Sequence, residues 1–202
     1  ILLLSGVKYR IGCAHPKGLL SPKGFFLSRK VKPISKVRHA IEDNLAVSKL
    51  IGAYPSKIKL EIFYDRKSDQ KAKQILKDLD IKQNDLKIII HPGSNYKDHD
   101  WDKNKCNQAA KTLLSALKAK ILITGSKDDI AKAKEIKKNL KNVYIIAGKT
   151  SIKETYALAD KADLILSVDT AMMHIAAALD KKTVSLFLGI GYPEKWYPYT
   201  EN

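Results

Sequence analysis

The sequence predicts an α/β fold built on a doubly wound parallel sheet. From residue 86 onward, short and almost wholly apolar runs alternate with stretches of helical period. Apolar strands separated by helices are typical of a parallel sheet that is covered on both faces. Small and polar residues also collect after the apolar runs, whereas Lys, Asn and Asp precede them. An apolar content of 45% supplies the core that such a fold needs.

Each element of this sheet is predicted from its own pattern. The helix expected at 104–118, for example, places Ala110, Leu113, Leu114 and Leu117 on one side. Five strands are expected, at 86–90, 121–124, 143–147, 164–168 and 183–188. Four helices are expected between them, at 104–118, 128–140, 151–161 and 171–179. This alternation predicts a Rossmann-like topology.

The first 80 residues carry a weaker pattern. Residues 14–38 are rich in Gly, Pro and Ser and are interpreted as loop. A helix is expected at 38–51, ending at Gly52, followed by an extended connector at 53–68. A short helix is expected at 69–79, with Ser68 or Asp69 as its N-cap.

The charge of the chain is strongly positive and unevenly distributed. The formal net charge is +16, from 37 basic and 21 acidic residues. Residues 1–41 contain no Asp or Glu but nine Lys and Arg, namely Lys8, Arg10, Lys17, Lys23, Arg29, Lys30, Lys32, Lys36 and Arg38. Such a segment attracts phosphates on nucleic acid, on anionic lipid or on a phosphorylated acceptor, or it is a solvated surface.

Other classes of protein are disfavoured by composition. The two cysteines, Cys13 and Cys106, are far apart and are expected to be reduced thiols. The five histidines form no ligand cluster, so we expect no metal site. No stretch reaches the ~18 to 20 apolar residues of a membrane span, and no secretory signal is visible. The chain begins at Ile1 within a pattern, so we expect a piece of a longer polypeptide.

The loop after the fourth expected strand is the best candidate for a phosphate site. Asp169 or Thr170 is expected to cap the following helix, which leaves the amides of 171–173 free to face a ligand. His174 lies about one turn further along and can face the same crevice. The alternative is an N-capped helix with an ordinary core histidine.

Two other loops following strands are candidates as well. In the loop at 91–95, Gly93 allows a positive φ and Ser94 offers donors, although a plain β-turn is the alternative. Ser151 with Glu154 predicts a capping box, beside which Thr150 would edge the crevice. No phosphate-loop lysine motif, G-x-G-x-x-G fingerprint or G-x-S-x-G elbow is present.

Taken together, these loops resemble glycosyltransferase family nine, the lipopolysaccharide heptosyltransferases. The matching segments, in order, are 39–52 (HAIEDNLAVSKLIG), 91–101 (HPGSNYKDHDW), 122–129 (LITGSKDD), 147–152 (AGKTSI), 162–179 (ADLILSVDTAMMHIAAAL) and 186–199 (LFLGIGYPEKWYPY). The resemblance implies the two-domain GT-B fold. Residues 1–60 would belong to a partial acceptor-binding domain, and residues 61–202 would form the donor-binding domain with its connector.

The resemblance also implies an activity. Family members transfer a heptose from an ADP-sugar to a lipid-linked lipopolysaccharide core, with inversion and without a bound metal or other cofactor. The donor site carried over by motif comprises Gly93, Ser94, Lys97, Asp129 (or its neighbour Asp128), Thr150, Asp169, Thr170, Ala171, Met172 and His174. In it, the segment at 169–174 would hold the diphosphate and sugar, Gly93 and Ser94 would meet the phosphates, and Thr150 would lie against the adenine. No catalytic residue is expected in this chain, because the family's catalytic Asp lies in an N-terminal segment absent from it.

Two residues depart from the family pattern. Ala171 stands where the family usually has Gly, and its methyl group is expected to crowd the diphosphate. His99 stands where the family often has Lys, and Lys97 is the expected substitute.

The resemblance gives the basic segment a specific hypothesis. The basic residues Lys23, Arg29 and Lys30 are expected to draw the protein to a phosphorylated acceptor at the inner face of the cytoplasmic membrane. The protein would then be cytoplasmic, with a peripheral membrane contact.

Three alternatives stay open at this point. One is a GT-B transferase that uses another nucleotide sugar, and another is a catalytically inactive relative. The third is a basic nucleic-acid-binding domain, although aromatic residues make up only 7% of the chain and the two tryptophans fall in crevice loops. We therefore expect no nucleic-acid partner.

Overall fold

A computed structural model of the chain describes residues 6–13, 25–31, 38–189 and 192–200. The chain divides into two compact units. Unit 1 contains Ile1–Ile58 and Tyr192–Tyr197, and unit 2 contains Lys59–Gly191 and Pro198–Asn202. The division after Ile58 falls two residues before the boundary expected from the sequence.

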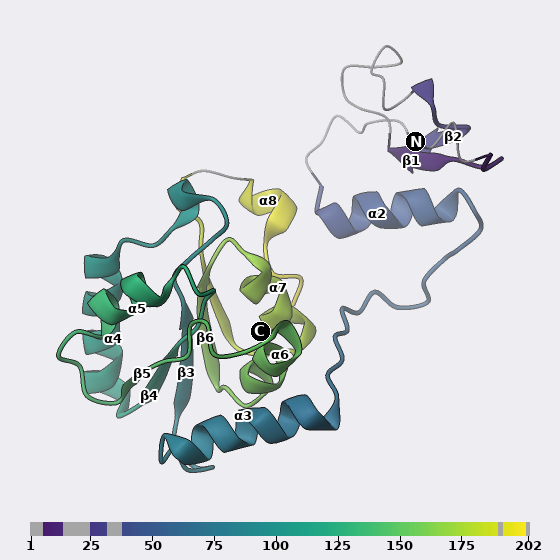
Figure 1. The fold of residues 1–202 in the computed structure, drawn as a ribbon. Helices are drawn as coiled ribbons and strands as arrows, with labels where there is room; N and C mark the ends of the chain where they lie inside the picture. Colours follow the sequence, from purple (N-terminus) through teal and green to yellow (C-terminus); the bar gives the residue numbers. More distant parts are fainter. Residues whose placement is uncertain (1–5, 14–24, 32–37, 190–191, 201–202) are drawn as a thin grey trace. The chain divides into compact units, whose positions relative to one another are not determined.

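Unit 2 is built on a parallel sheet in the strand order β5-β4-β3-β6-β7 (Figure 1). Its strands are β3 (Lys87–His91), β4 (Lys120–Ile123), β5 (Val143–Ile145), β6 (Leu164–Val168) and β7 (Thr183–Leu186). Its helices are α3 (Arg66–Asp78), α4 (Lys103–Leu117), α5 (Ile130–Lys137), α6 (Ile152–Asp160) and α7 (Ala171–Ala178), with a 3-10 turn, η1, at Lys97–His99. The five predicted strands and four intervening helices are confirmed, with ends that shift by up to three residues.

The sheet has helices on both faces because its strands are apolar on both faces. In β3, Ile88 and Ile90 pack with residues of α4 and α5, whereas Ile89 packs with α3, α6 and α7. Figure 1 shows α4 and α5 on one side of the sheet and α6 and α7 on the other. The doubly wound class predicted from the sequence is therefore confirmed.

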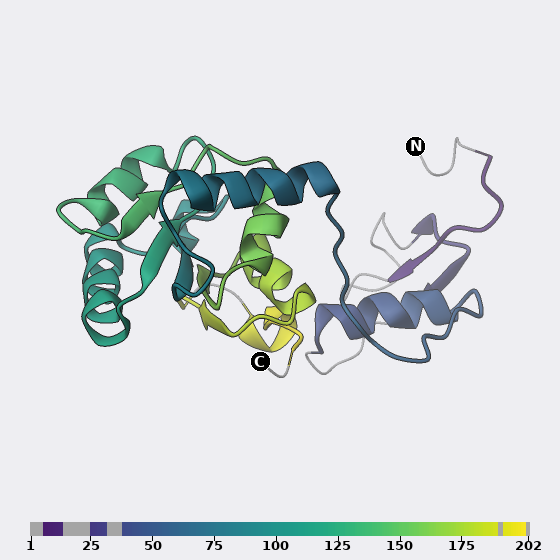
Figure 2. The ribbon, with the colours of Figure 1, turned by 90° about the horizontal axis from the view of Figure 1, so that it is seen from below.

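Helix α3 begins three residues earlier than the sequence predicted, and the predicted cap is wrong. The N-cap is Asp65, whose carboxylate accepts a hydrogen bond from the Ser68 amide at 2.8 Å. Asp69 lies inside the helix and pairs with Lys73 and Lys161. The ion pair between Asp69 and Lys161 joins α3 to the C-terminal end of α6. Figure 2 shows α3 along its length. The first turn of α3 consists of polar residues, so the spacing of apolar residues does not indicate where the helix begins.

Helix α6 begins with the capping box that the sequence predicted. The Ser151 amide donates to Glu154 Oε2 at 2.7 Å, and the Glu154 amide donates to Ser151 Oγ at 3.4 Å. The backbone bond at Ser151 holds the pKa of the Glu154 carboxyl below its ordinary value. This box fixes the start of α6 and thereby the position of Thr150 just before it.

Unit 1 contains two short parallel strands, β1 (Ile11–Cys13) and β2 (Arg29–Val31), together with α2 (Ala40–Lys49) and α8 (Pro193–Trp196). Strand β2 corrects the expectation that all of 14–38 is loop; residues 14–24 and 32–37 of that segment lie outside the described residues. Strand β2 has only three residues, too few to show an alternation of apolar and polar residues. It is recognised only by its pairing with β1.

His39 joins α2 to the C-terminal segment within unit 1. Its Nδ1 accepts the Ile41 amide at 3.2 Å, which makes it the N-cap of α2. Its Nε2 lies 2.9 Å from the carbonyl oxygen of Tyr197, and the two rings meet edge to face. A ring that accepts at Nδ1 must donate at Nε2, so one tautomer satisfies both bonds.

Both cysteines are free, and Cys106 is buried whereas Cys13 is exposed. Among the described residues, no helix has the length and apolar character needed to cross a membrane.

Candidate functional site

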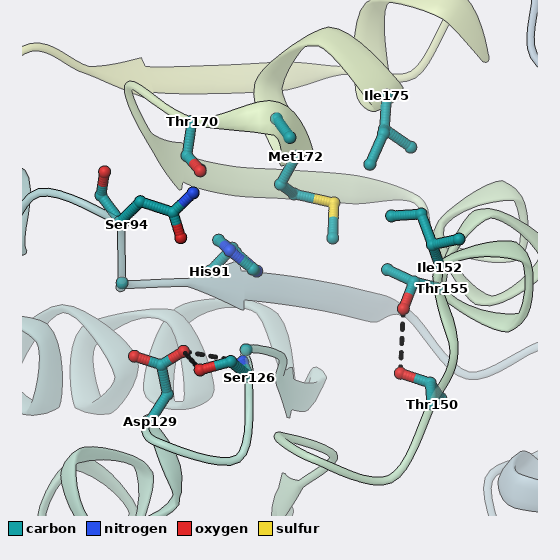
Figure 3. Close-up of a pocket in the computed structure, with 14 residues that line it drawn as sticks. His91, Ser94, Ser126, Asp129, Thr150, Ile152, Thr155, Thr170, Met172 and Ile175 are labelled. Carbon is teal, nitrogen blue, oxygen red and sulfur yellow. Dashed lines mark hydrogen bonds between the residues drawn. The ribbon is translucent and has the colours of Figure 1, made fainter.

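A pocket of about 290 Å³ opens where the strands of unit 2 end (Figure 3). Its walls come from the loops after β3, β4, β5 and β6 and from the start of α7. The pocket therefore spans the boundary between β3 and β6, where the chain reverses its direction of winding. Doubly wound sheets bind ligands at this switch point. The residues that line it are His91, Gly93, Ser94, Asn95, Gly125, Ser126, Asp129, Thr150, Ile152, Thr155, Thr170, Ala171, Met172 and Ile175.

The structure brings together seven of the ten residues that the sequence placed in the donor site. Those lining the pocket are Gly93, Ser94, Asp129, Thr150, Thr170, Ala171 and Met172. Asp169 and His174 do not line it, and the side chain of Lys97 lies outside the described residues. Asp169 Oδ2 instead lies 3.9 Å from Nδ1 of His99.

Gly93 is needed for a reason other than the expected positive φ. Its φ is not in the left-handed region. A Cβ at this position would instead lie 2.4 Å from Asp129 Oδ1, and one at Gly125 would lie 2.7 Å from Asp129 Cβ. The two glycines thus make room for one carboxylate. Ser126 holds that carboxylate from the other side, donating from its amide at 2.7 Å and from Oγ at 2.8 Å to Oδ2.

The backbone amide of Ser94 is not available as a donor to a ligand, although its side chain is. This amide donates to Asp100 Oδ1 at 2.7 Å. Asp100 is also ion-paired with Lys132 of α5, and the Trp101 amide donates to the Pro92 carbonyl at 2.9 Å. The loop after β3 therefore folds back on itself, because a carboxylate six residues along satisfies the amide. The Ser94 side chain still faces the pocket.

The start of α7 forms one wall of the pocket. Thr170 is the N-cap, as the sequence allowed, but its side chain makes no capping hydrogen bond. The Met173 amide donates to the Thr170 carbonyl at 3.1 Å, so it is not one of the free donors that were expected. The amides of Ala171 and Met172 have no intrahelical acceptor at this helix start, and such groups bind anions.

His91 is a pocket residue that sequence reasoning missed. Its Nδ1 lies 2.9 Å from Oγ1 of Thr124, a buried residue that directly follows β4. Burial lowers the pKa of His91 to about 4, only partly offset by Asp129 and Asp100. The ring is therefore neutral at physiological pH. The sequence could have predicted this residue, because His91 directly follows three isoleucines and a polar residue there marks the end of a buried strand.

The opposite end of the pocket is apolar, and most of it was also missed. Ile152, Met172 and Ile175 line it, and Figure 3 shows them gathered near Thr150 and Thr155. Only Thr150 and Met172 of this group were predicted. Ile152 and Ile175 are apolar residues of α6 and α7, so no polar residue type marks them as part of a site.

In the described part of the chain, no three His, Cys, Asp or Glu side chains are grouped so that they could hold a metal ion. The polar groups that line the pocket are hydroxyls, backbone amides, the Asn95 side-chain amide, the His91 imidazole and the Asp129 carboxylate.

The sequence matches the family described as glycosyltransferase family 9 (heptosyltransferase) over residues 2–202. This chain belongs to glycosyltransferase family 9. A curated family 9 relative, lipopolysaccharide heptosyltransferase 3 of Escherichia coli strain K12, is 32% identical over 167 residues, which cover 81% of this chain and 48% of the relative. The chain therefore spans about half the length of this curated relative.

Two solved structures share the fold. The family 9 glycosyltransferase of Veillonella parvula DSM 2008 has a TM-score of 0.80 at 19% identity, covering 96% of this chain and 54% of that one. E. coli heptosyltransferase WaaC, solved with ADP-2-deoxy-2-fluoro heptose, has a TM-score of 0.62 at 19% identity, covering 88% of this chain and 53% of that one. The GT-B relationship expected from the sequence is thereby confirmed.

Proposed function

We propose that unit 2 binds the nucleotide part of an ADP-sugar and serves as the donor half of a heptosyltransferase. The observation that carries this proposal is a pocket at the switch point of the sheet, with the N-terminus of α7 in one wall and an apolar end. The family and the ligand named for WaaC support the same class of donor.

The pocket suggests an orientation for the nucleotide. The amides of Ala171 and Met172 would hold the diphosphate, and the apolar end beside Ile152 and Ile175 would hold the base. Asp129 would lie between them and accept from the ribose hydroxyls, because its Oδ1 has no hydrogen bond to Ser126. A carboxylate repels phosphates, so it is better placed at the ribose than at the diphosphate.

The proposed reaction is an inverting transfer that needs no metal. An acceptor hydroxyl attacks the anomeric carbon of the sugar from the face opposite the diphosphate, and the bond to ADP breaks. The two free amides of α7 stabilise the negative charge that develops on the departing diphosphate. We assign no residue of this chain as the base that takes the proton of the acceptor.

Donor binding is tested by changing the helix start. The substitution Ala171→Glu places a carboxylate where the phosphates would lie, while an acidic residue in the first turn of a helix favours the fold itself. We expect ADP and ADP-heptose to raise the Tm of the wild-type chain, and this rise to be lost in Ala171→Glu. Ala171→Gln is the matched neutral control and should retain at least part of the response.

The expected rise in stability depends on the ligand concentration relative to the dissociation constant. At 100 times its dissociation constant a ligand adds about 2.7 kcal/mol of stability, which is readily measured. UDP and GDP serve as competing nucleotides. If no nucleotide stabilised the wild-type chain, or if Ala171→Glu responded to ADP as the wild type does, the proposed donor site would be wrong.

We further propose that the protein is cytoplasmic and that unit 1 contacts a phosphorylated lipid-linked acceptor at the inner face of the cytoplasmic membrane. Arg29 lies 5.9 Å from the ring of Tyr9 and donates to the Leu50 carbonyl at 3.2 Å, and Lys8 lies 5.6 Å from the same ring. Tyr9 and Phe25 are 63% and 75% exposed. Exposed aromatic rings beside cations favour a membrane interface with anionic lipids. Lys23 falls outside the described residues.

Vesicle sedimentation tests this contact. The chain should co-sediment with vesicles containing anionic lipid and much less with neutral ones. Lys8→Glu and Lys30→Glu together should weaken binding, and Phe25→Ser should weaken it further. Equal binding of the wild type and the charge-reversed variant would contradict the proposal.

A further inference from the structure

An ion pair joins the loop after β3 to the first turn of α5. Oδ2 of Asp100 pairs there with the ammonium group of Lys132. The two side chains are 23% and 20% exposed, so water screens their interaction less than that of an exposed pair. Neither residue lines the pocket, so any effect of this pair on a ligand must pass through other residues.

The carboxylate of Asp100 passes the contact on to the wall of the pocket. Its Oδ1 accepts the hydrogen bond from the Ser94 amide at 2.7 Å. The Trp101 amide donates to the Pro92 carbonyl at 2.9 Å and closes the same loop. One carboxylate therefore bonds Ser94, which lines the pocket, with one oxygen and α5 with the other.

The start of α5 also supplies a carboxylate to the pocket itself. Asp129 is the N-cap of α5, and its carboxylate occupies the place that a Cβ at Gly93 would take. Figure 3 shows Ser94 and Asp129 at the same end of the pocket. The loop after β3 and the start of α5 thus meet in two places, and the pair of Asp100 with Lys132 is the one outside the pocket.

Lys132 also balances a negative charge close to the pocket. Asp100 acts electrostatically on the ring of His91, which lines the pocket, in the direction that raises the pKa of that ring. Without Lys132, a mostly buried carboxylate would lose its cation, which is costly, and it would turn toward water. The Ser94 amide would then lose its acceptor, and a diphosphate would meet an uncompensated negative charge.

We infer that Lys132 is a positioning residue for the donor, which acts through Asp100 by holding the Ser94 wall in place and by cancelling the charge of that carboxylate. The inference rests on the proposed function, because it takes the ligand of this pocket to carry a diphosphate.

The substitution Lys132→Met removes the cation and keeps a side chain of similar length. We expect isothermal titration of the 202-residue chain with ADP to show about tenfold weaker binding in this variant. Lys132→Arg restores the cation and should bind ADP within about threefold of the wild type. Lys134→Met is the matched control, because it removes one positive charge from an exposed position of the same helix and should leave ADP binding unchanged.

A double-mutant cycle shows whether Lys132 acts through Asp100. Asp100→Asn removes the negative charge but keeps an oxygen that can accept from the Ser94 amide. In the Asp100→Asn background, Lys132→Met should therefore change the affinity for ADP by less than about twofold. If Lys132 merely supported α5 by packing, the tenfold loss would appear in both backgrounds, and the inference would be wrong.

Hydrogen exchange of the Ser94 amide, measured by NMR without nucleotide, separates this inference from the proposed function. We expect exchange to be at least about tenfold faster in Lys132→Met and unchanged in Lys132→Arg. If the wild type bound ADP but Lys132→Met changed neither affinity nor exchange, the inference alone would be wrong. If the wild type bound no ADP, the proposed function would be wrong, and the assignment of Lys132 to donor binding would fall with it even where Ser94 exchanged faster.

Discussion

Gly93→Ala tests whether Gly93 is needed because the Asp129 carboxylate occupies the place that a Cβ would take. The new Cβ would lie 2.4 Å from Asp129 Oδ1 and 2.9 Å from its Cγ. Because ordinary contacts of a Cβ begin near 3.4 Å, the carboxylate must move by about 1 Å. Such a movement breaks or weakens at least one of its bonds to Ser126.

The change in the free energy of unfolding caused by Gly93→Ala can be worked out from these contacts. A hydrogen bond to a charged group contributes about 1.5–3 kcal/mol. Replacing Gly by Ala also removes freedom from the unfolded chain, which favours folding by about 0.4–1 kcal/mol where the backbone permits Ala. We therefore expect Gly93→Ala to lower the free energy of unfolding by about 1–2 kcal/mol. In a chain of this size that corresponds to a drop in Tm of about 2–8 °C.

A double-mutant cycle isolates the carboxylate as the cause. All three atoms nearest the new Cβ at Gly93 belong to the Asp129 carboxylate, so Asp129→Ala should remove the cost of Gly93→Ala. At Gly125 the closest atom is Asp129 Cβ at 2.7 Å, which Asp129→Ala retains. Gly125→Ala should therefore stay destabilising in the Asp129→Ala background.

Urea unfolding of unit 2 is the assay. The chain has two tryptophans, and Trp196→Phe leaves Trp101 as the reporter within unit 2. Reading one unit avoids mixing two transitions in one curve. The reasoning is refuted if Gly93→Ala costs as much with Asp129→Ala as without it, or if Gly125→Ala is rescued equally well.

Three further outcomes are expected. His91 has a pKa of about 4 in the folded chain and about 6.5 in the unfolded chain, so the unfolded chain binds its proton first as the pH falls. The free energy of unfolding should therefore be unaffected by His91 above pH 6.5 and should fall by about 3 kcal/mol between pH 6.5 and pH 4. His91→Asn should remove this fall, and an unchanged pH profile in that variant would contradict the buried neutral ring. Ser151→Ala should lower the free energy of unfolding by about 1 kcal/mol through loss of the capping box, whereas Ser151→Gly should cost only a few tenths, and equal costs in urea titrations would argue against the cap. Burial raises the pKa of Cys106 to about 12, so a thiol reagent at pH 8 should label exposed Cys13 in the folded chain and both cysteines in denaturant; two fast thiols in the folded chain would disprove the burial of Cys106.

The sequence by itself determined the α/β class, the five strands of unit 2 and the loops in which a ligand site would lie. These features depend on local period and on the rule that parallel strands end at one edge, so residues such as Ile88 to Ile90 suffice to predict them. The capping box at Ser151 was predictable for the same reason, because both partners lie within three residues.

Tertiary structure alone decided which groups in those loops are available to a ligand. The Ser94 amide is satisfied by Asp100, Gly93 makes room for Asp129 rather than adopting a positive φ, and Asp169 lies near His99 outside the pocket. Hydrogen bonds and close contacts of this kind depend on where loops fold back in space, and a pattern of residue types along the chain does not contain that information.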